Sequence, residues 1–501
     1  MKVSGRLLAR NTALSLGGQL APMVVALVAV PMLIHRLGTD RFGVLTLAWT
    51  VIGYFGLFDF GIGRALTQAA SQALGRDDPE ELAQVSASAL VAMFALGAVG
   101  TVALAAGSHA LVYRVLHVPA GLQREALYSF YLMALSLPFV LTAGGLRGLL
   151  EAHQHFGLVN ALRVPFGILN YLAPLLVLPF SHSLVAIVAV LCVLRIASWM
   201  VHALVCFKQY PFLRGARIGS FATLTPLLRL GGWMTVSNIV SPLMSNLDRF
   251  IVGGMLSVGA VAYYATPFDA VGRVMLLPSS IMAVFFPAFA ATHVGERTLT
   301  TSLFGRATRL IAAATFPALA LVVTFAHAIL SIWIGPAFAR ESTSILQWLA
   351  IGMYFTGFAQ VPFGLLQAVG RPDLTAKLHL AELPIYVALI VALTHSFGLV
   401  GVAMAFTGRV IVDIAALYFF SRRALREGRG VIDRCALTAL LSAGIMAVGA
   451  LSNAFIFTVP FATILIAGWA LGGWRWLLTA EERAMVLGLL PGFPRKEPRA
   501  A

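Results

Sequence analysis

The stretch GGWMTVSNIVSPLMSNLDRFIVGGMLSVGAVAYYATPF, residues Gly231–Phe268, decides the fold because it joins two apolar segments through a short turn. It predicts a membrane helix followed by the start of a second one. A polar stripe that includes an arginine is costly in lipid, so such a stripe is expected to face protein or water. We interpret the stripe in the first helix as one wall of a translocation cavity. Its four members recur every four residues, which places them on one helix face: Ser237, Ser241, Ser245 and Arg249.

The composition sets the class of protein. Of the 501 residues, 59% are hydrophobic and only 11% are charged, whereas soluble domains carry roughly 25% charged residues. The sequence therefore predicts an all-α polytopic membrane protein. The first apolar segment, residues 11–34, is too long for the core of a signal peptide, and we expect an uncleaved first span. The three cysteines have no paired spacing, so neither a disulfide framework nor a zinc site is predicted.

Apolar segments long enough to cross about 30 Å of hydrocarbon recur along the whole chain. If the N-terminus lies inside, most of the 35 lysines and arginines fall on the inner side, which is the side that basic residues favour. We therefore expect both termini in the cytoplasm. The net charge of +15 then reflects this topology, and no nucleic-acid partner is predicted. The fourteen predicted spans are residues 11–34, 43–66, 82–107, 124–147, 156–180, 183–207, 231–256, 259–290, 304–333, 343–368, 376–397, 399–420, 434–453 and 456–478.

An internal repeat organises these spans. Four pairs of features keep the same order at a nearly constant offset, as a duplicated unit of six helices would. Because six is even, both copies enter the membrane in the same sense, which predicts a pseudo-two-fold axis along the membrane normal. The pairs are LGTDRFGVL (Leu37–Leu45) with LSVGAVAYY (Leu256–Tyr264), Pro22 with Pro242, RGLLEAHQHF (Arg147–Phe156) with FGLLQAVGRP (Phe363–Pro372), and Arg195 with Arg409.

The repeat divides the chain into two lobes and an appendix. We expect one six-helix lobe over residues 1–216 and a second over 217–432, followed by two appended helices over 433–480 and a basic cytoplasmic tail over 481–501. Two lobes that face each other leave a central cleft, and rocking of one lobe against the other predicts alternating access. The sequence contains no phosphate-binding loop of the kind that ATPases use.

The opening of the chain resembles a known family. Residues Arg10–Thr67 contain an LGxxxFG turn and the sequence LFDFGIGRAL, and they look like the first two helices of polysaccharide and O-antigen flippases of the multidrug/oligosaccharidyl-lipid/polysaccharide exporter superfamily. The resemblance extends more weakly over the whole chain. It implies a non-enzymatic flippase of the bacterial inner membrane that moves undecaprenyl-pyrophosphate-linked oligosaccharide to the periplasmic leaflet. It also implies that the last two helices offer a groove for the lipid tail.

Arginines in the second lobe are the leading candidates for a substrate contact, because the planar guanidinium suits the oxygens of a pyrophosphate. Arg273 lies in the eighth span, and Asp269 precedes it by one helical turn. The two can pair, either as a gate that yields to the substrate or as a permanent structural ion pair. Arg249 lies nearer the outer end of its helix, where snorkelling to the interface is the alternative to a cavity role.

The first lobe offers a second polar stripe and a pair of charges. Asn11, Ser15 and Gln19 share one helix face at the start of the first span, where they face the cleft or pack helices together. Asp59 and Arg64 lie at the inner end of the second span, and we assign them a gating or structural role. No metal site and no cofactor are predicted.

Other intramembrane charges stay outside the predicted site. Arg195 and Arg409 occupy matching places in the two lobes, which favours a shared structural role. Asp413 follows Arg409 by one turn and has no acidic counterpart in the first lobe. Arg163 and Glu382 have no partner that the sequence identifies.

Several functions remain open from the residues. Under an inside-negative potential, export of an anionic headgroup needs cationic groups along its path more than a dedicated fuel, but coupling to a proton or sodium gradient or to the membrane potential stays open. The alternatives are a peptidoglycan-precursor lipid flippase, a multidrug or cation antiporter, and a membrane glycan polymerase or ligase, for which the short outer loops leave little room. We expect a monomer in the lipid bilayer that works beside the polysaccharide polymerase machinery.

Overall fold

The computed structural model describes residues 5–57, 63, 66–67, 70, 78–153, 155–213, 244, 246–292, 297–425, 428–451 and 468, with the backbone alone for residues 5–20, 52–57, 156, 212, 287, 290, 291 and 451. Within these ranges the chain is helical and no strand occurs, which confirms the predicted all-α class. Ten of the described helical segments are long and apolar enough to cross a membrane. The count of fourteen spans stays a prediction, since nearly all of the span predicted at 456–478 and most of the one at 231–256 lie outside the described residues.

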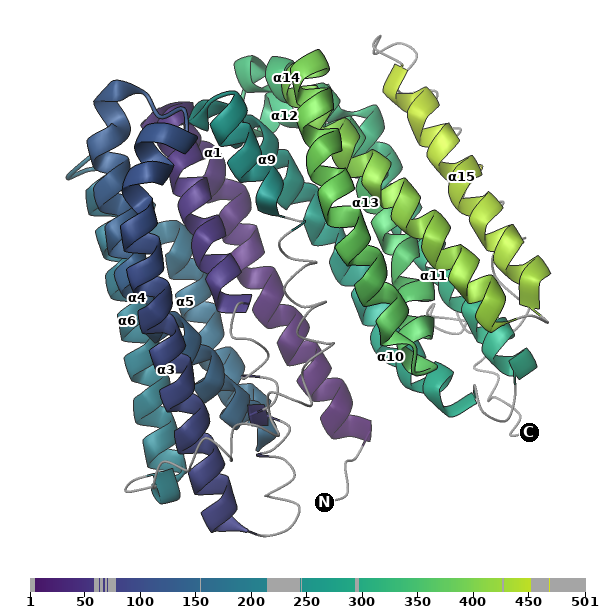
Figure 1. Cartoon of the computed structure of the whole chain (residues 1–501), viewed down its shortest axis with the longest axis horizontal. Coiled ribbons are helices and arrows are strands. Elements are labelled where there is room, and N and C mark those ends of the chain that lie inside the picture. Colours follow the sequence, from purple (N-terminus) through teal and green to yellow (C-terminus); the bar gives the residue numbers. More distant parts are fainter. Residues whose placement is uncertain are drawn as a thin grey trace, which may run out of the picture. The chain divides into compact units, whose positions relative to one another are not determined.

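The chain divides into two compact units, residues Met1–Ala265 and Thr266–Ala501. The predicted boundaries at 216/217 and 432/433 stay predictions. The elements, of which Figure 1 labels the α-helices, are α1 (Gly5–Leu57), α3 (Pro79–Ala110), η1 (Leu111–Val115), α4 (Ala120–Ala152), α5 (Phe156–Val177), α6 (Leu184–Gln209), η2 (Pro211–Leu213), α9 (Val258–Gly272), η3 (Arg273–Met275), α10 (Leu276–Thr292), α11 (Arg297–Thr324), α12 (Ala326–Trp333), α13 (Pro336–Ala368), α14 (Pro372–Ala424) and α15 (Arg429–Leu451).

Two glycines break the longest helices at the places where the sequence predicts turns between spans. Gly38 interrupts α1 with φ 77° and ψ 162°, and Gly398 interrupts α14 with φ 58° and ψ −138°. A positive φ is strained for any residue with a Cβ atom, which is why glycine occupies both positions. The predicted pairs of spans, 11–34 with 43–66 and 376–397 with 399–420, meet at these two glycines.

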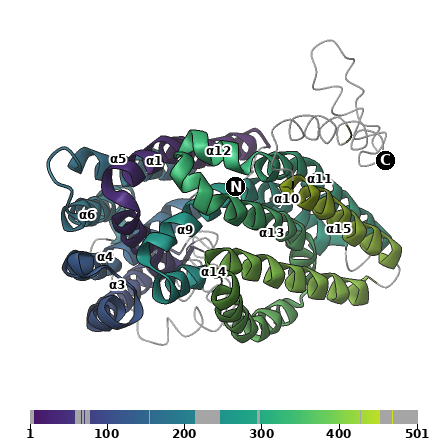
Figure 2. The ribbon, with the colours of Figure 1, turned by 90° about the horizontal axis from the view of Figure 1, so that it is seen from above.

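In the first unit, small residues bring α3 against α4, and Figure 2 shows these two helices side by side beside α6. A Cβ atom on Gly97 would lie 2.4 Å from Cα of Pro138, so the helix backbones touch there. The Thr101 hydroxyl donates a hydrogen bond of 2.7 Å to the carbonyl oxygen of Ala134. Close approach of small residues is the usual basis of helix association in a membrane.

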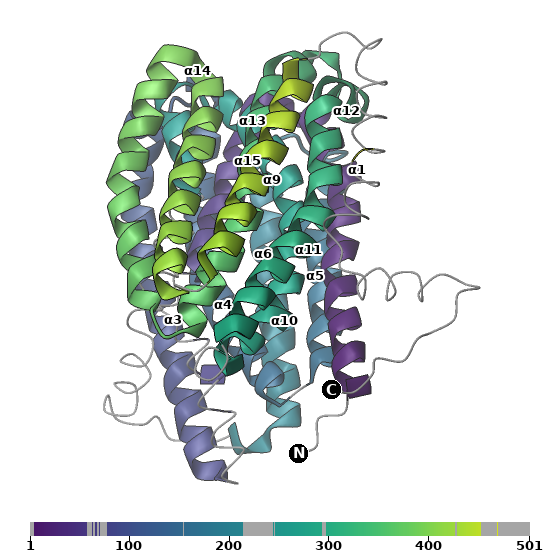
Figure 3. The same ribbon diagram turned by 90° about the vertical axis from the view of Figure 1, so that its right-hand side faces the viewer.

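The second unit packs around α13, a helix with a largely buried surface. It contacts α14, α11, α10, α12 and α15, and Figure 3 shows α13 beside α15 and α11. A Cβ atom on Gly352 would lie 2.7 Å from the ring of Phe406, and the Thr407 hydroxyl donates a hydrogen bond of 2.7 Å to the carbonyl oxygen of Trp348. These contacts fix the second arm of α14 against α13.

Candidate functional site

The sequence-predicted serine stripe and the charges of the second span lie outside the described residues: Ser237, Ser241, Ser245, Asp59 and Arg64. Asn11, Ser15 and Gln19 lie in α1, and the structure describes only their backbone. Their roles stay predictions.

Arg249 is buried inside the first unit. It lies in the helical residues 246–255, and its Nη1 donates a hydrogen bond of 3.0 Å to the Thr50 hydroxyl of α1. The adjacent Asp248 is fully buried; it accepts hydrogen bonds from the backbone N–H of Arg249 and from the hydroxyl of Tyr264 in α9. The arginine is therefore held by protein at the point where this segment meets α1. Its contact with substrate stays a prediction.

Arg273 lies at a break between two helices of the second unit. It opens η3, a single 3₁₀ turn between α9 and α10. A stretch of 3₁₀ helix inside a longer helix often marks a hinge. The side chains of Arg273 and of Asp269 one turn earlier are both exposed. The contact of Arg273 with substrate and the gating role of the pair stay predictions.

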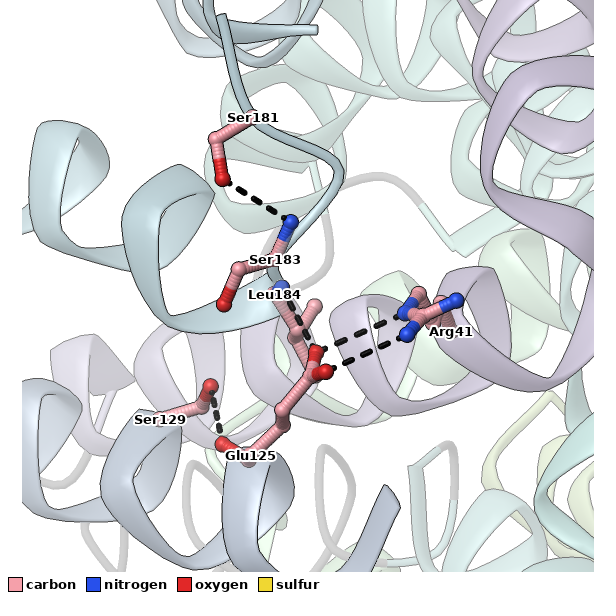
Figure 4. Close-up of polar contacts among 6 residues, drawn as sticks. All are labelled: Arg41, Glu125, Ser129, Ser181, Ser183 and Leu184. Atoms are coloured by element: carbon pink, nitrogen blue, oxygen red, sulfur yellow. Dashed lines mark hydrogen bonds and ion pairs between the residues drawn. The ribbon is translucent and has the colours of Figure 1, made fainter. Parts of the chain in front are cut away.

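A half-buried ion pair ties three helices of the first unit together, as Figure 4 shows. Arg41 of α1 donates from Nη2 to Glu125 Oε1 at 3.1 Å and from Nε to Oε2 at 3.4 Å. The same carboxylate accepts a hydrogen bond of 2.9 Å from the backbone N–H of Leu184, the first residue of α6. A carboxylate at a helix N-terminus accepts a hydrogen bond from an otherwise unpaired N–H and interacts favourably with the positive end of the helix dipole. These bonds make Glu125 a structural clamp between α1, α4 and α6.

The structure also brings together four polar residues that sequence reasoning left apart, three of them buried and the fourth, Arg409, with 12% of its side chain exposed. Glu382 and His379 come from the first arm of α14, and Arg409 and Asp413 come from the second. Arg409 Nη1 lies 3.8 Å from Glu382 Oε2, and His379 Nε2 lies 3.9 Å from Asp413 Oδ1. The two pairs are nested around the turn at Gly398, so the arms run antiparallel and side by side. We call these four residues the α14 charge cluster.

Aromatic rings surround the α14 charge cluster. The guanidinium carbon of Arg409 lies 5.2 Å from the ring centroid of Tyr386 and 5.6 Å from that of Phe406. The ring of Phe363 in α13 stacks on His379 with centroids 5.9 Å apart. A cation over an aromatic face is favoured electrostatically. Arg409 thus contacts two aromatic rings and Glu382, which fits the structural role that the sequence suggested for this arginine. The same contact gives Glu382 the partner that the sequence did not identify.

The spacing of these residues contains the signal that sequence reasoning missed. The spans 376–397 and 399–420 are joined by a short connection, which predicts antiparallel neighbours. Charges equally far from the turn then lie at the same depth. Glu382 and Arg409, at 16 and 11 residues from Gly398, meet this condition approximately, as do His379 and Asp413 at 19 and 15 residues.

Two histidines and a tyrosine form an aromatic cluster at the end of α4. The ring of His153 stacks on Tyr210 with centroids 4.0 Å apart, and the Tyr210 hydroxyl lies 3.0 Å from Nδ1 of His155. Burial lowers the pKa of His153 from its usual range. Burial, with a smaller contribution from Cys206, raises the pKa of Tyr210. Both groups are therefore kept neutral, as a packing role requires.

The fold is that of a membrane transporter. A multidrug-resistance MATE family transporter of the MOP superfamily, solved in an inward-facing conformation, matches with a TM-score of 0.70 at 16% identity, over 82% of this chain and 98% of that one. The lipid II flippase MurJ in an inward closed conformation matches with a TM-score of 0.66 at 12% identity, over 92% of this chain and 99% of that one. These likenesses define the class of fold.

The sequence defines the family more narrowly. The profile of the family described as polysaccharide biosynthesis protein matches residues 8–293. A putative O-antigen transporter of Shigella flexneri is 29% identical over 417 residues, which cover 83% of this chain and 97% of the relative. The lipopolysaccharide biosynthesis protein WzxC of Escherichia coli K12 is 25% identical over 201 residues, 40% of each chain. The chain belongs to the polysaccharide biosynthesis protein family, and the resemblance found in its opening helices is confirmed.

Proposed function

We propose that this protein is a flippase that moves undecaprenyl-pyrophosphate-linked oligosaccharide from the cytoplasmic to the periplasmic leaflet of the bacterial inner membrane. The observation that carries the proposal is the near full-length match to a putative O-antigen transporter, which extends over 97% of that relative. The ten described candidate spans provide the multi-pass membrane framework. We expect both termini in the cytoplasm and a monomer that delivers its product to polysaccharide polymerase machinery.

Alternating access is the mechanism we assign to this flippase. Its support is the division into two compact units, the predicted parallel repeat of six helices, and helix breaks at Gly38, Gly398 and η3. Parallel-repeat transporters expose a site to each side in turn by rocking one half against the other. Breaks of helical geometry at defined residues supply positions that absorb such a movement.

Arginine chemistry supports an anionic cargo. Arg273 is exposed, and a guanidinium is suited to bidentate binding of phosphate oxygens. An inside-negative potential of 100 mV favours outward movement of one negative charge by about 2.3 kcal/mol. Replacing Arg273 by Ala should reduce transport about tenfold or more, because hydrogen bonds to charged groups contribute roughly 1.5–3 kcal/mol. Replacement by Lys should retain part of the activity, since the charge persists without the planar fork.

A leaflet assay on reconstituted protein tests the proposal. Proteoliposomes would contain undecaprenyl-pyrophosphate-linked oligosaccharide with its sugar accessible to a membrane-impermeant reagent on one side only. We expect protein-dependent loss or gain of reagent access with the wild type and a reduced rate with Arg273→Ala. The matched control Arg371→Ala should keep the wild-type rate, because Arg371 pairs with Asp373 outside the predicted site. Parallel liposomes with lipid II or with a cationic drug test the two rival cargoes. Transport of lipid II or of the cationic drug, without transport of the glycan lipid, would refute the proposal.

A further inference from the structure

The α14 charge cluster is buried deep in its hairpin. Glu382 and His379 expose 6% and 8% of their side chains. By the predicted spans, Arg409 lies ten residues into 399–420 and Glu382 six residues into 376–397, which is about 15 Å and about 9 Å along the helix axis within about 30 Å of hydrocarbon. Ionisable groups at such depth are rare and commonly belong to ion or proton pathways.

Several polar atoms of the cluster lack completed hydrogen bonds. Among the described residues, neither carboxylate oxygen of Glu382 has a hydrogen-bond partner, and the same is true of Asp413 Oδ1 and His379 Nδ1. One ligand atom each from His379, Glu382 and Asp413 lies within 4.8 Å of the other two. Buried polar atoms are normally satisfied, so three convergent acceptors define a place for a small positively charged ligand.

The charge of the cluster identifies that ligand. Two carboxylates face one guanidinium, which leaves one surplus negative charge when His379 is neutral. A buried uncompensated charge is strongly unfavourable. One proton restores neutrality, whereas a divalent metal ion would reverse the sign and lie next to the fixed positive charge of Arg409. A monovalent metal ion prefers oxygen ligands in larger number, and an imidazole nitrogen suits it poorly. A proton fits both the charge and the set of donor atoms.

We propose that His379, Glu382, Arg409 and Asp413 form a proton-binding site that couples transport to a proton gradient. The coupling rests on the proposed flippase function, whereas proton binding does not. The proton adds to a carboxylate oxygen of Glu382 or Asp413 and forms an O–H bond; the remaining carboxylate pairs with Arg409. Release of the proton leaves one uncompensated charge between the arms of α14, which favours a conformation that admits water to the hairpin.

Neighbouring elements bring few other titratable groups to this site. Tyr386 lies under Arg409. Helix α13 presents the ring of Phe363, and its only charged residues, Arg340 and Glu341, lie about 30 Å or more away along its axis. Helix α9 contacts Phe406 through Phe268, and the charged residues that follow, Asp269 in α9 and Arg273 in η3, are exposed. On α15, Asp433 pairs with Arg422 at 3.2 Å.

Proton binding can be measured on the purified protein without any glycan. Infrared spectra recorded through a pH titration detect the carbonyl stretch of a protonated buried carboxyl group. We expect one such band in the wild type and its loss in Glu382→Gln and in Asp413→Asn. Each variant leaves one carboxylate opposite Arg409, so both stay charge-balanced and are expected to fold. Asp373→Asn is the matched control on the same helix, because Asp373 forms exposed ion pairs with Arg371 and Lys377.

Removal of the arginine provides an independent arm. Arg409→Gln leaves two carboxylates without a guanidinium, so proton uptake should rise from one to two per protein. A band that persists unchanged in both carboxylate variants would overturn the proposal. So would calorimetric binding of Zn²⁺ or Na⁺ to the wild type that disappears in Glu382→Gln, since the site would then hold a metal ion.

A transport measurement separates the coupling from the flippase function. In proteoliposomes with an imposed pH gradient, glycan-lipid movement by the wild type should accelerate when the gradient is applied, and Glu382→Gln should lose this acceleration. Movement that is equally independent of the gradient in both proteins would refute the coupling. Loss of all glycan movement in the wild type, with the proton band intact, would refute the proposed function and leave the proton site standing.

Discussion

The clamp formed by Arg41, Glu125 and the start of α6 offers a sharp test of how the first unit is held together. In Glu125→Ala, Arg41 loses both carboxylate bonds and the backbone N–H of Leu184 loses its acceptor. Removing one partner leaves the other groups to be resolvated, and hydrogen bonds to charged groups contribute roughly 1.5–3 kcal/mol. Arg41 and Glu125 expose 34% and 25% of their side chains, so solvent screening reduces the effect. We expect a loss of about 2 kcal/mol of unfolding free energy.

Related substitutions divide this loss between its parts. Glu125→Gln keeps an oxygen acceptor for the N–H of Leu184 but removes the charge that holds Arg41. Arg41→Ala keeps the cap on α6 and removes only the ion pair. Each should therefore cost about 1 kcal/mol, about half of the effect of Glu125→Ala. In the double variant Arg41→Ala with Glu125→Gln, the losses should be less than additive, because both remove the same interaction.

Reversible unfolding of the purified protein in mixed detergent micelles measures these differences, with secondary structure followed by circular dichroism. Arg371→Ala serves as the control, since it breaks an exposed ion pair and should leave stability unchanged within error. The reasoning is wrong if Glu125→Ala is no less stable than Arg371→Ala, or if Glu125→Gln is as damaging as Glu125→Ala. The second result would mean that the charge alone, and not the helix cap, explains the clamp.

Three further predictions concern the packing of helices, the buried arginine of the first unit and a histidine near the end of α4. Gly97→Ala should lower the unfolding free energy by about 2 kcal/mol or more, because its Cβ would overlap the backbone at Pro138; Gly144→Ala, with open space around its Cβ, should not, and equal effects in the same unfolding assay would refute the close approach. Thr50→Val should destabilise by about 1–2 kcal/mol, since it leaves Arg249 Nη1 without this buried acceptor while keeping the side-chain shape; unchanged stability would show that the bond contributes nothing. Because burial lowers the pKa of His153 below the unfolded value, the unfolded state binds more protons, so stability should fall as the pH drops below the usual histidine value of about 6.5; His153→Asn should flatten this fall in a thermal unfolding series, and an unchanged slope would exclude His153 as its cause.

Hydrophobicity and turn residues predicted the helical framework well because they act locally. Apolar length identifies a span wherever it occurs, and the glycines at 38 and 398 lie between spans that were predicted separately. In α1 and α14, the break in the helix falls at a glycine between two predicted apolar spans. Apolar length and the position of the glycine together therefore predict where each long helix is interrupted.

Side-chain partners were harder to predict because they join distant parts of the chain. Glu125 is 84 residues from Arg41, and Thr50 is 199 residues from Arg249. Periodicity places each residue on a helix face but does not say which other helix that face meets. The α14 charge cluster is an intermediate case, because one short turn relates its members. Glu382 and Arg409 therefore lie within reach of sequence reasoning that treats two adjacent spans as one hairpin.

The hairpin of α14 also has a consequence for the biogenesis of the protein. Insertion of each arm into the bilayer by itself would place Glu382, or Arg409 and Asp413, in hydrocarbon without a partner. Each such charge opposes insertion by about 2.5–3.5 kcal/mol at the centre of a span. Because the turn at Gly398 is short, Arg409 on the second arm can pair with Glu382 on the first arm while the two arms enter the bilayer from the protein-insertion machinery. The membrane-inserting unit is then the pair of arms, and the polar residues that burden each arm alone become the contacts that hold the pair together.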